Sequence, residues 1–216
     1  MGLWSLLAFF VAILVQASDF AVADCPADPS EPVNVELQLL ITDLIEIDPK
    51  RSEIELVLIV DHKWTNKDSA PTKQCGSNVF VGHYKDFFDT HWHPVLNFVN
   101  ERKFEIQRGP HANIFVADYK NGTVWMSYRA KATFPCKSGT RAGSLLCTMD
   151  YESYQYSANS VTLSMNRDHP IKFLGNRRVT SNYNCTEILG PYITRQTYAV
   201  GEWYTASFRL EFQPIN

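Results

Sequence analysis

The chain has 216 residues, with 23 acidic and 20 basic side chains and a formal net charge of -3 at pH 7. This near balance excludes the strong surface potential that draws a protein to nucleic acid or to an anionic membrane, so we expect neither as a partner. The length suits one domain with a substantial core.

The N-terminal segment is predicted to be a secretory signal peptide. An apolar run from Leu3 to Val15 precedes a polar break and the small residues of Ala21-Val22-Ala23, the pattern of a cleavage site. We therefore expect residues 1–23 to be removed, a single mature domain over 24–216, and secretion. No later stretch is apolar for the roughly 20 residues that span a bilayer, although a membrane anchor at the N-terminus stays open because no Lys or Arg lies near Met1.

The next predicted elements are two strands at 34–48 and 52–64. Both are rich in Val, Ile and Leu that alternate in part with charged residues, and the turn at 49–51 joins them into a hairpin. The start of the first strand and the end of the second then lie at one end of the domain. This predicts a disulfide between Cys25 and Cys75.

The segment 112–134 is predicted to be a second hairpin, because Asn121-Gly122 is a strong two-residue turn signal. Asn121-Gly-Thr is also a glycosylation acceptor, as is Asn184-Cys-Thr. Between this hairpin and the last strands, Cys136 and Cys147 enclose ten residues. That spacing matches neither a zinc site nor a redox pair, so a structural bridge is expected in an oxidising compartment. Because the five cysteines are an odd number, at least one thiol stays free or pairs with another chain.

Three further strands are predicted at 160–165, 187–196 and 202–212. In the last, the even-numbered residues from Tyr204 to Phe212 share one face, which we expect in the core, and the odd-numbered residues share the other, which stays available. Many strands, frequent turn signals and almost no helical periodicity predict an all-β fold, an antiparallel β-sandwich.

No enzyme or cofactor is expected, because the chain lacks a Gly-x-Ser-x-Gly elbow, a Gly-rich phosphate loop and a His-Glu-x-x-His motif. His91 and His93 would share one face of a strand, with His83 or His111 as a third metal ligand. No spacing here matches a recognised site, so we predict no metal.

Aromatic residues carry the functional signal. The chain has 13 Phe, 10 Tyr and 5 Trp, more than one small core obviously needs. Tyr154 and Tyr156 follow the expected bridge, and Tyr198 and Trp203 flank the turn at Val200-Gly201. Packing is the commoner role for any one of them, but their order along the chain favours a site.

That order, a bridge, an aromatic strand and an aromatic hairpin before the final strand, resembles the extracellular ligand-binding domain of Cys-loop receptors. These are the pentameric neurotransmitter-gated channels, and their soluble relatives are the acetylcholine-binding proteins. Val60-Asp61-His62-Lys63 stands where the family has Trp-x-Asp-x-Arg, Trp92-His93-Pro94 where it has Trp-x-Pro-Asp, and Asn100 closes that segment. The resemblance implies an immunoglobulin-like sandwich of about ten strands, with the family's N-terminal helix missing or vestigial.

The resemblance also implies a homopentamer that holds a small organic ligand, cationic or amphiphilic, between neighbouring subunits. Ring faces attract an organic cation by about 0.5 to 2 kcal/mol each. The matching positions on the principal face are Val99, Tyr154, Tyr198 and Trp203. Those on the complementary face are Ile54, Leu56, Trp125 and Ser127.

Departures from the family pattern shape the expected function. Val99 and Ile54 replace aromatics, the adjacent cysteine pair of nicotinic principal subunits is missing, and the bridge encloses ten residues where the family has thirteen. The Phe-Pro-Phe-Asp stretch, which in channels transmits gating, is also absent, and the chain ends after the last strand. We therefore expect a secreted binding protein of the acetylcholine-binding-protein type. The alternatives are a channel ectodomain and a structural ring without a ligand.

Overall fold

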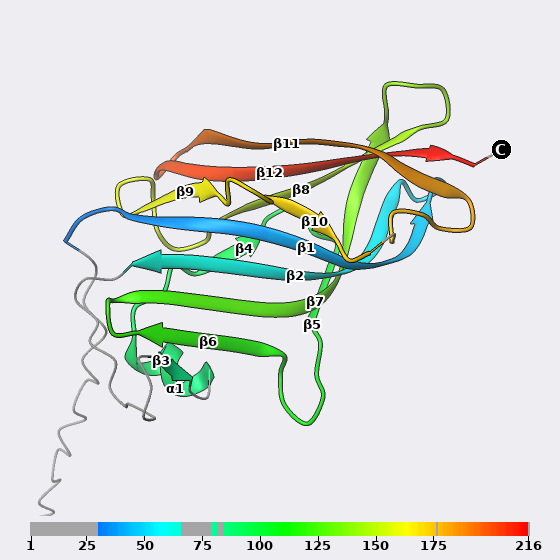
Figure 1. Ribbon diagram of the computed structural model, residues 1–216. Helices are drawn as coiled ribbons and strands as arrows, with labels where there is room; N and C mark the ends of the chain where they lie inside the picture. The colour runs from blue at the N-terminus through cyan, green and yellow to red at the C-terminus, as the bar shows by residue number, and fades with distance from the viewer. Residues whose placement is uncertain (1–29, 66–78, 82–83, 176, 216) are drawn as a thin grey trace, which may run out of the picture.

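The strands of this chain form two facing sheets, which one long strand connects (Figure 1). The structure is a computed structural model that describes residues 30–65, 79–81, 84–175 and 177–215. The predicted signal peptide, the N-terminal helix position and the Cys25–Cys75 bond lie outside the described residues. The elements are β1 (Val33–Asp48), β2 (Glu53–Thr65), β3 (Val79–Val81), α1 (Tyr84–Thr90), β4 (Leu96–Phe98), β5 (Lys103–Ile106), β6 (Ile114–Tyr119), β7 (Thr123–Ser138), β8 (Leu145–Ser153), β9 (Val161–Met165), β10 (Ile171–Phe173), β11 (Tyr183–Tyr198) and β12 (Gly201–Pro214).

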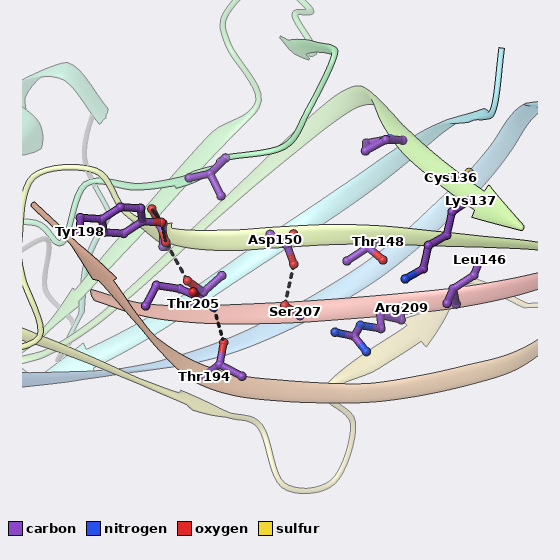
Figure 2. Close-up of a pocket in the computed structure, with 14 residues that line it drawn as sticks. Cys136, Lys137, Leu146, Thr148, Asp150, Thr194, Tyr198, Thr205, Ser207 and Arg209 are labelled. Atoms are coloured by element: carbon purple, nitrogen blue, oxygen red, sulfur yellow. Dashed lines mark hydrogen bonds between the residues drawn. The ribbon is translucent and has the colours of Figure 1, made fainter. Parts of the chain in front are cut away.

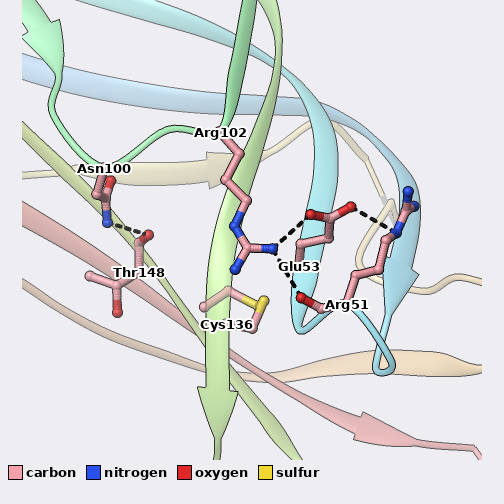
Figure 3. Close-up of a disulfide and its surroundings, with 7 residues drawn as sticks. Arg51, Glu53, Asn100, Arg102, Cys136 and Thr148 are labelled. Carbon is pink, nitrogen blue, oxygen red and sulfur yellow. Dashed lines mark hydrogen bonds and ion pairs between the residues drawn. A yellow bond between two sulfur atoms is a disulfide. The ribbon is translucent and has the colours of Figure 1, made fainter.

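Strand β7 belongs to both sheets. From Thr123 to Pro135 it pairs with β2, in the sheet that also contains β1 and β6. Its last residues then pair with β8, in the sheet that contains β12 and β11. Cys136 and Cys147 lie opposite each other at this crossing, with their Cα atoms 4.0 Å apart, and form a disulfide. The predicted bridge is confirmed, and it ties the second sheet to β7 where β7 leaves the first (Figure 3).

The core lies between the two sheets and follows the predicted alternation. On β12, Ala206, Phe208, Leu210 and Phe212 are buried, as expected of that face. On the opposite face, which we expected to be available, Thr205, Ser207 and Glu211 are buried too, because each bonds to a polar neighbour. This face is therefore a polar surface whose side chains are held by fixed contacts.

The all-β sandwich and both predicted hairpins are confirmed, with two differences. Strands β9 and β10 pair in parallel with β1, so the sandwich is not purely antiparallel. Helix α1 precedes the segment that begins at His91, where no helical periodicity was recognised. In the described ranges, no helix has the length and apolar character needed to cross a membrane.

Candidate functional site

An open pocket of about 490 Å³ lies on the outer surface of β8, β11 and β12 (Figure 2). Val99 and the end of β7 complete its wall. The lining residues are Val99, Pro135, Cys136, Lys137, Leu146, Thr148, Asp150, Glu152, Thr194, Gln196, Tyr198, Thr205, Ser207 and Arg209.

The alternation of β8 places two carboxylates in this pocket. Cys147, Met149 and Tyr151 are buried in the core. Since successive side chains of a strand point to opposite faces, Asp150 and Glu152 point outward, and both line the pocket. The disulfide therefore contributes indirectly, because Cys147 fixes the phase of the strand that carries the two acids.

Glu152 is held at the end of the pocket nearest the β11–β12 turn. Only 8% of its surface is exposed. The Tyr198 hydroxyl donates to its carboxylate at 3.2 Å, and the Thr205 hydroxyl donates to Oε2 at 2.7 Å. A carboxylate has about four lone-pair positions, so these bonds leave it able to accept from a ligand.

Asp150 is fixed by partners from two other segments. Ser207 Oγ donates to its Oδ1 at 2.6 Å, and Asn100 Nδ2 donates to its Oδ2 at 3.1 Å. Asn100 also bonds to the backbone of β8, through Thr148 O and the Asp150 amide (Figure 3). The asparagine that was noted for its place in the sequence therefore holds the segment of Val99 against β8.

Tyr198 supplies both a hydroxyl and a ring face. Burial and the neighbouring Glu152 carboxylate raise its pKa above the usual value, so its hydroxyl stays protonated and donates at neutral pH. Its ring meets Trp203 edge to face, with centroids 5.6 Å apart. The β11–β12 turn thus brings an aromatic pair to the acidic end of the pocket.

The far end of the pocket is basic. Lys137 and Arg209 line it, and the Arg209 guanidinium lies 5.0 Å from the ring centroid of Tyr192. Thr205 is opposite Glu152 and Arg209 is opposite Thr148, so Glu152 and Arg209 are separated by about 14 Å along the strands at ~3.4 Å per residue. The pocket therefore has separate acidic and basic ends.

The structure brings together most of the predicted principal face. Val99 and Tyr198 line the same pocket, and Trp203 packs on Tyr198. Tyr154 follows Glu152 at the end of β8 but is 78% exposed and lies outside the pocket wall. Its ring is free to meet a ligand or a neighbouring chain.

The structure corrects the prediction that Ile54 and Leu56 belong to the complementary face. Both are 0% exposed in the core, because every even-numbered residue of β2 from Ile54 to Trp64 is buried, and Val57 is the one odd-numbered residue of β2 that is buried with them. The outward positions are the odd-numbered ones, and Asp61 among them accepts a bond from Trp125 Nε1 at 3.3 Å.

Trp125 and Ser127 do lie on the outer face of the first sheet. Trp125 meets Phe115 edge to face at 5.5 Å, and Phe115 and Ser127 line a shallow pocket of about 320 Å³. This sheet is the other layer of the sandwich from the one that carries Glu152 and Tyr198. The two predicted faces can therefore meet only between two copies of the chain.

The prediction that His91 and His93 share one face of a strand was wrong. The segment 91–95 is not a strand, and the His91 and His93 rings lie against Phe87 and Phe88 at 4.9 and 4.7 Å. His83 lies outside the described residues, and in the rest no group of three side chains is arranged to hold a metal.

Among the described cysteines, Cys185 is the one without a disulfide partner, as the odd number of cysteines predicted. It is unpaired and buried, and burial raises its pKa to about 11. A thiol in this state is a poor nucleophile at neutral pH, because the thiolate is the reactive form. Cys185 is therefore a packing residue.

The residues that the sequence reasoning missed are Asp150, Glu152 and Phe115. The signal for the two acids was present, since fixing Cys147 inward assigns the even-numbered residues of 146–152 to the outer face. Phe115 could be identified only from the pairing of β6 with β7, which places it opposite Ser127.

Comparison with known proteins gives one family. Residues 14–211 match the model described as neurotransmitter-gated ion-channel ligand binding domain. A Caenorhabditis elegans protein named probable ligand-gated ion channel 46 is 23% identical over 86% of this chain and 37% of its own length. The acetylcholine-gated chloride channel subunit acc-1 of the same organism is 23% identical over 68% and 32%, and the serotonin-gated chloride channel mod-1 is 23% identical over 63% and 28%. The chain spans about a third of the length of these relatives.

Proposed function

The chain belongs to the family of neurotransmitter-gated ion-channel ligand-binding domains, and from this premise we propose that its pocket on β8, β11 and β12 binds a small organic cation. The observation that carries the proposal is the fixed, nearly buried carboxylate of Glu152 beside Tyr198, against whose ring Trp203 packs. An ammonium group placed there donates to Glu152 and lies against ring faces of negative potential.

A primary or secondary amine fits this end better than a quaternary ammonium. Glu152 offers hydrogen-bond acceptor positions, which only a cation with N–H groups can use. Two relatives are named as gated by acetylcholine and by serotonin, both of which are organic cations at neutral pH, and this supports a cation here. The basic end near Lys137 and Arg209 lies too far away for a compact zwitterion, so it would contact only a longer ligand.

The second half of the site is proposed to come from a neighbouring copy. Trp125 and Ser127 are retained as complementary residues, with Phe115 in place of the buried Ile54 and Leu56. Because principal and complementary residues lie on different layers, a closed ring lets every copy use both, and the family supports five copies. Native mass spectrometry of the purified domain would give the mass of a pentamer, and a mass that stays monomeric at all concentrations would refute the ring.

The whole protein is proposed to be a subunit of a ligand-gated channel, with this chain as its extracellular part. The relatives named above are channels or channel subunits. The secreted binding protein favoured by the sequence stays a second candidate, since the loop between Cys136 and Cys147 is short and lacks the stretch that transmits gating. Full-length transcript sequencing decides: membrane-spanning segments after residue 216 support a channel, and a stop codon there supports the secreted form.

The ligand proposal is tested by thermal shift with a panel of biogenic amines and neutral alcohols of the same skeletons. We expect at least one amine to raise the melting temperature of the wild type and not of Glu152→Gln. The matched control is Glu187→Gln, which changes an exposed acid on β11 outside the pocket. Stabilisation by the neutral compounds alone, or by no compound, would contradict a cation site.

A further inference from the structure

The turn between β6 and β7 presents the side chain of Asn121 in a fixed orientation. The Gly122 amide donates to Tyr119 O at 2.9 Å, and Gly122 has a φ of 78°, which favours glycine. The Thr123 amide donates to Asn121 Oδ1 at 3.0 Å. Asn121 is exposed, and with its oxygen held by the turn, its Nδ2 is the atom left to the outside.

The same turn borders a second pocket, of about 480 Å³, on the outer face of the first sheet. Tyr119, Asn121, Thr123 and Trp125 lie along one side of it. The other lining residues are polar or charged apart from Leu37: they are Glu36, Gln38, Asp61, Lys63 and Asn166. Aromatic rings beside a rim of carboxylate, amide and ammonium groups suit a sugar, which has apolar C–H faces and hydroxyl edges.

We propose that Asn121 carries an N-linked glycan whose first N-acetylglucosamine stacks on the Tyr119 ring and lies over this pocket. Tyr119 precedes Asn121 by two residues and lines the same pocket, so its ring is within reach of the sugar. The C–H groups of the sugar carry partial positive charge and are attracted to the negative face of the ring. The sugar therefore stabilises the turn to which it is attached.

The attachment is an ordinary group transfer in the secretory pathway. Asn121 Nδ2 loses a proton and forms a bond to C1 of the sugar. The bond from C1 to the pyrophosphate of a lipid-linked donor breaks, and the pyrophosphate leaves with the electron pair. The extracellular location of this family's ligand-binding domains supplies the compartment. The inference does not depend on the amine site.

The second acceptor, Asn184, is an internal control. It lies within β11, where the residue two positions before it is Asn182, so it has no ring at that position. The hydroxyl of its acceptor threonine, Thr186, donates to Glu211 O at 3.4 Å. A glycan at Asn184 would lack the aromatic platform, and its removal should leave the stability of the fold unchanged.

The consequence for assembly is specific. A glycan over this pocket keeps the Tyr119 end of β6 and β7 out of any interface between copies. The complementary surface must then use the part of the sheet around Phe115 and Ser127, with only the edge of Trp125 that faces Phe115.

The test uses the full chain secreted from eukaryotic cells and trimmed enzymatically to one N-acetylglucosamine per site. Intact mass of the wild type, Asn121→Gln and Asn184→Gln should show one sugar at Asn121. Its presence should raise the melting temperature by about 2–4 °C, the size of one good contact in a domain of this length. The gain should persist in Tyr119→Phe and vanish in Tyr119→Leu.

An unmodified Asn121, or an equal gain in Tyr119→Leu, would overturn the proposal. If Tyr119→Leu is not secreted, NMR of the wild type decides, because stacked sugar protons shift upfield in the ring current. Sugar protons at the positions of a free glycan would refute the stacking. Loss of the amine response with the glycan intact would count against the proposed ligand and leave this inference standing.

Discussion

Acid should destabilise this domain through His62, a histidine buried between the two sheets. Its ring is 0% exposed, and burial lowers its pKa from 6.5 to about 3. His62 Nε2 lies 2.6 Å from the Tyr151 hydroxyl, which also contacts Tyr128 and donates to Leu96 O at 3.1 Å. Nδ1 has no hydrogen-bond partner. A proton added there would be a buried donor and a buried charge without a partner.

The direction and size of the change in unfolding free energy with pH follow from the difference between the folded and unfolded pKa values of His62. Because the folded pKa is depressed, the neutral ring's contribution is complete above pH 6.5 and is lost as pH falls toward 3. At one pKa unit per 1.36 kcal/mol, unfolding free energy falls by about 3 kcal/mol between pH 7.5 and 4.5 from this residue alone.

The assay is urea unfolding from pH 7.5 to 4.5 of the wild type and His62→Phe. We expect the wild type to take up increasingly more protons on unfolding than the variant as pH falls below 6.5, approaching one extra proton at pH 4.5. Phe keeps the stack of His62 on Tyr151, whose centroids are 5.5 Å apart, and removes only the titration and the hydrogen bond. His169→Gln, an exposed histidine, is the control and should follow the wild type. Identical pH slopes for the wild type and His62→Phe would refute this reasoning.

Two further predictions concern the loop and the segment beside the site. Thr140 donates to Glu211 from its hydroxyl and its amide, Ser144 donates as well, and these bonds lower the Glu211 pKa. Glu211→Gln should lower the free energy of unfolding by about 1.5–3 kcal/mol and speed amide exchange in residues 139–144. Unchanged exchange would show that the disulfide alone orders the loop. Since that pKa is depressed, the contribution is present at neutral pH and is lost only as the carboxyl is protonated in acid. Val95 has a φ of 45°, a strained value for a β-branched residue, so Val95→Asn should raise the melting temperature by about 2–4 °C, and a lower melting temperature would mean that the strain is absent.

Local patterns were enough to predict the hairpins, the bridge and the aromatic pair. The alternation of residues 34–64 and the Asn121-Gly122 turn are signals within one stretch of chain. The spacing of Cys136 and Cys147 and the position of Tyr198 and Trp203 around their turn are equally local. Each of these features was confirmed by the structure.

The errors arose where a position was taken from the family resemblance or depended on pairing between distant strands. Ile54 and Leu56 were assigned to the complementary face from the resemblance to the family, although their alternation with Glu53 and Glu55 points them to the core. The parallel pairing of β9 and β10 with β1 joins segments more than a hundred residues apart, which no local pattern specifies. The outward face of Glu152 followed from the alternation around Cys147, but its fixed position depends on hydroxyl partners from β11 and β12, which the sequence of β8 does not show.

The most direct test of the account is calorimetric titration of the wild type and Glu152→Gln with one amine and its neutral alcohol analogue. Loss of a charged hydrogen-bond acceptor costs about 1.5–3 kcal/mol. We therefore predict that Glu152→Gln weakens the amine about 10–100-fold and leaves the alcohol nearly unchanged. Equal affinity of the amine for both proteins would contradict the central claim that Glu152 anchors the ligand.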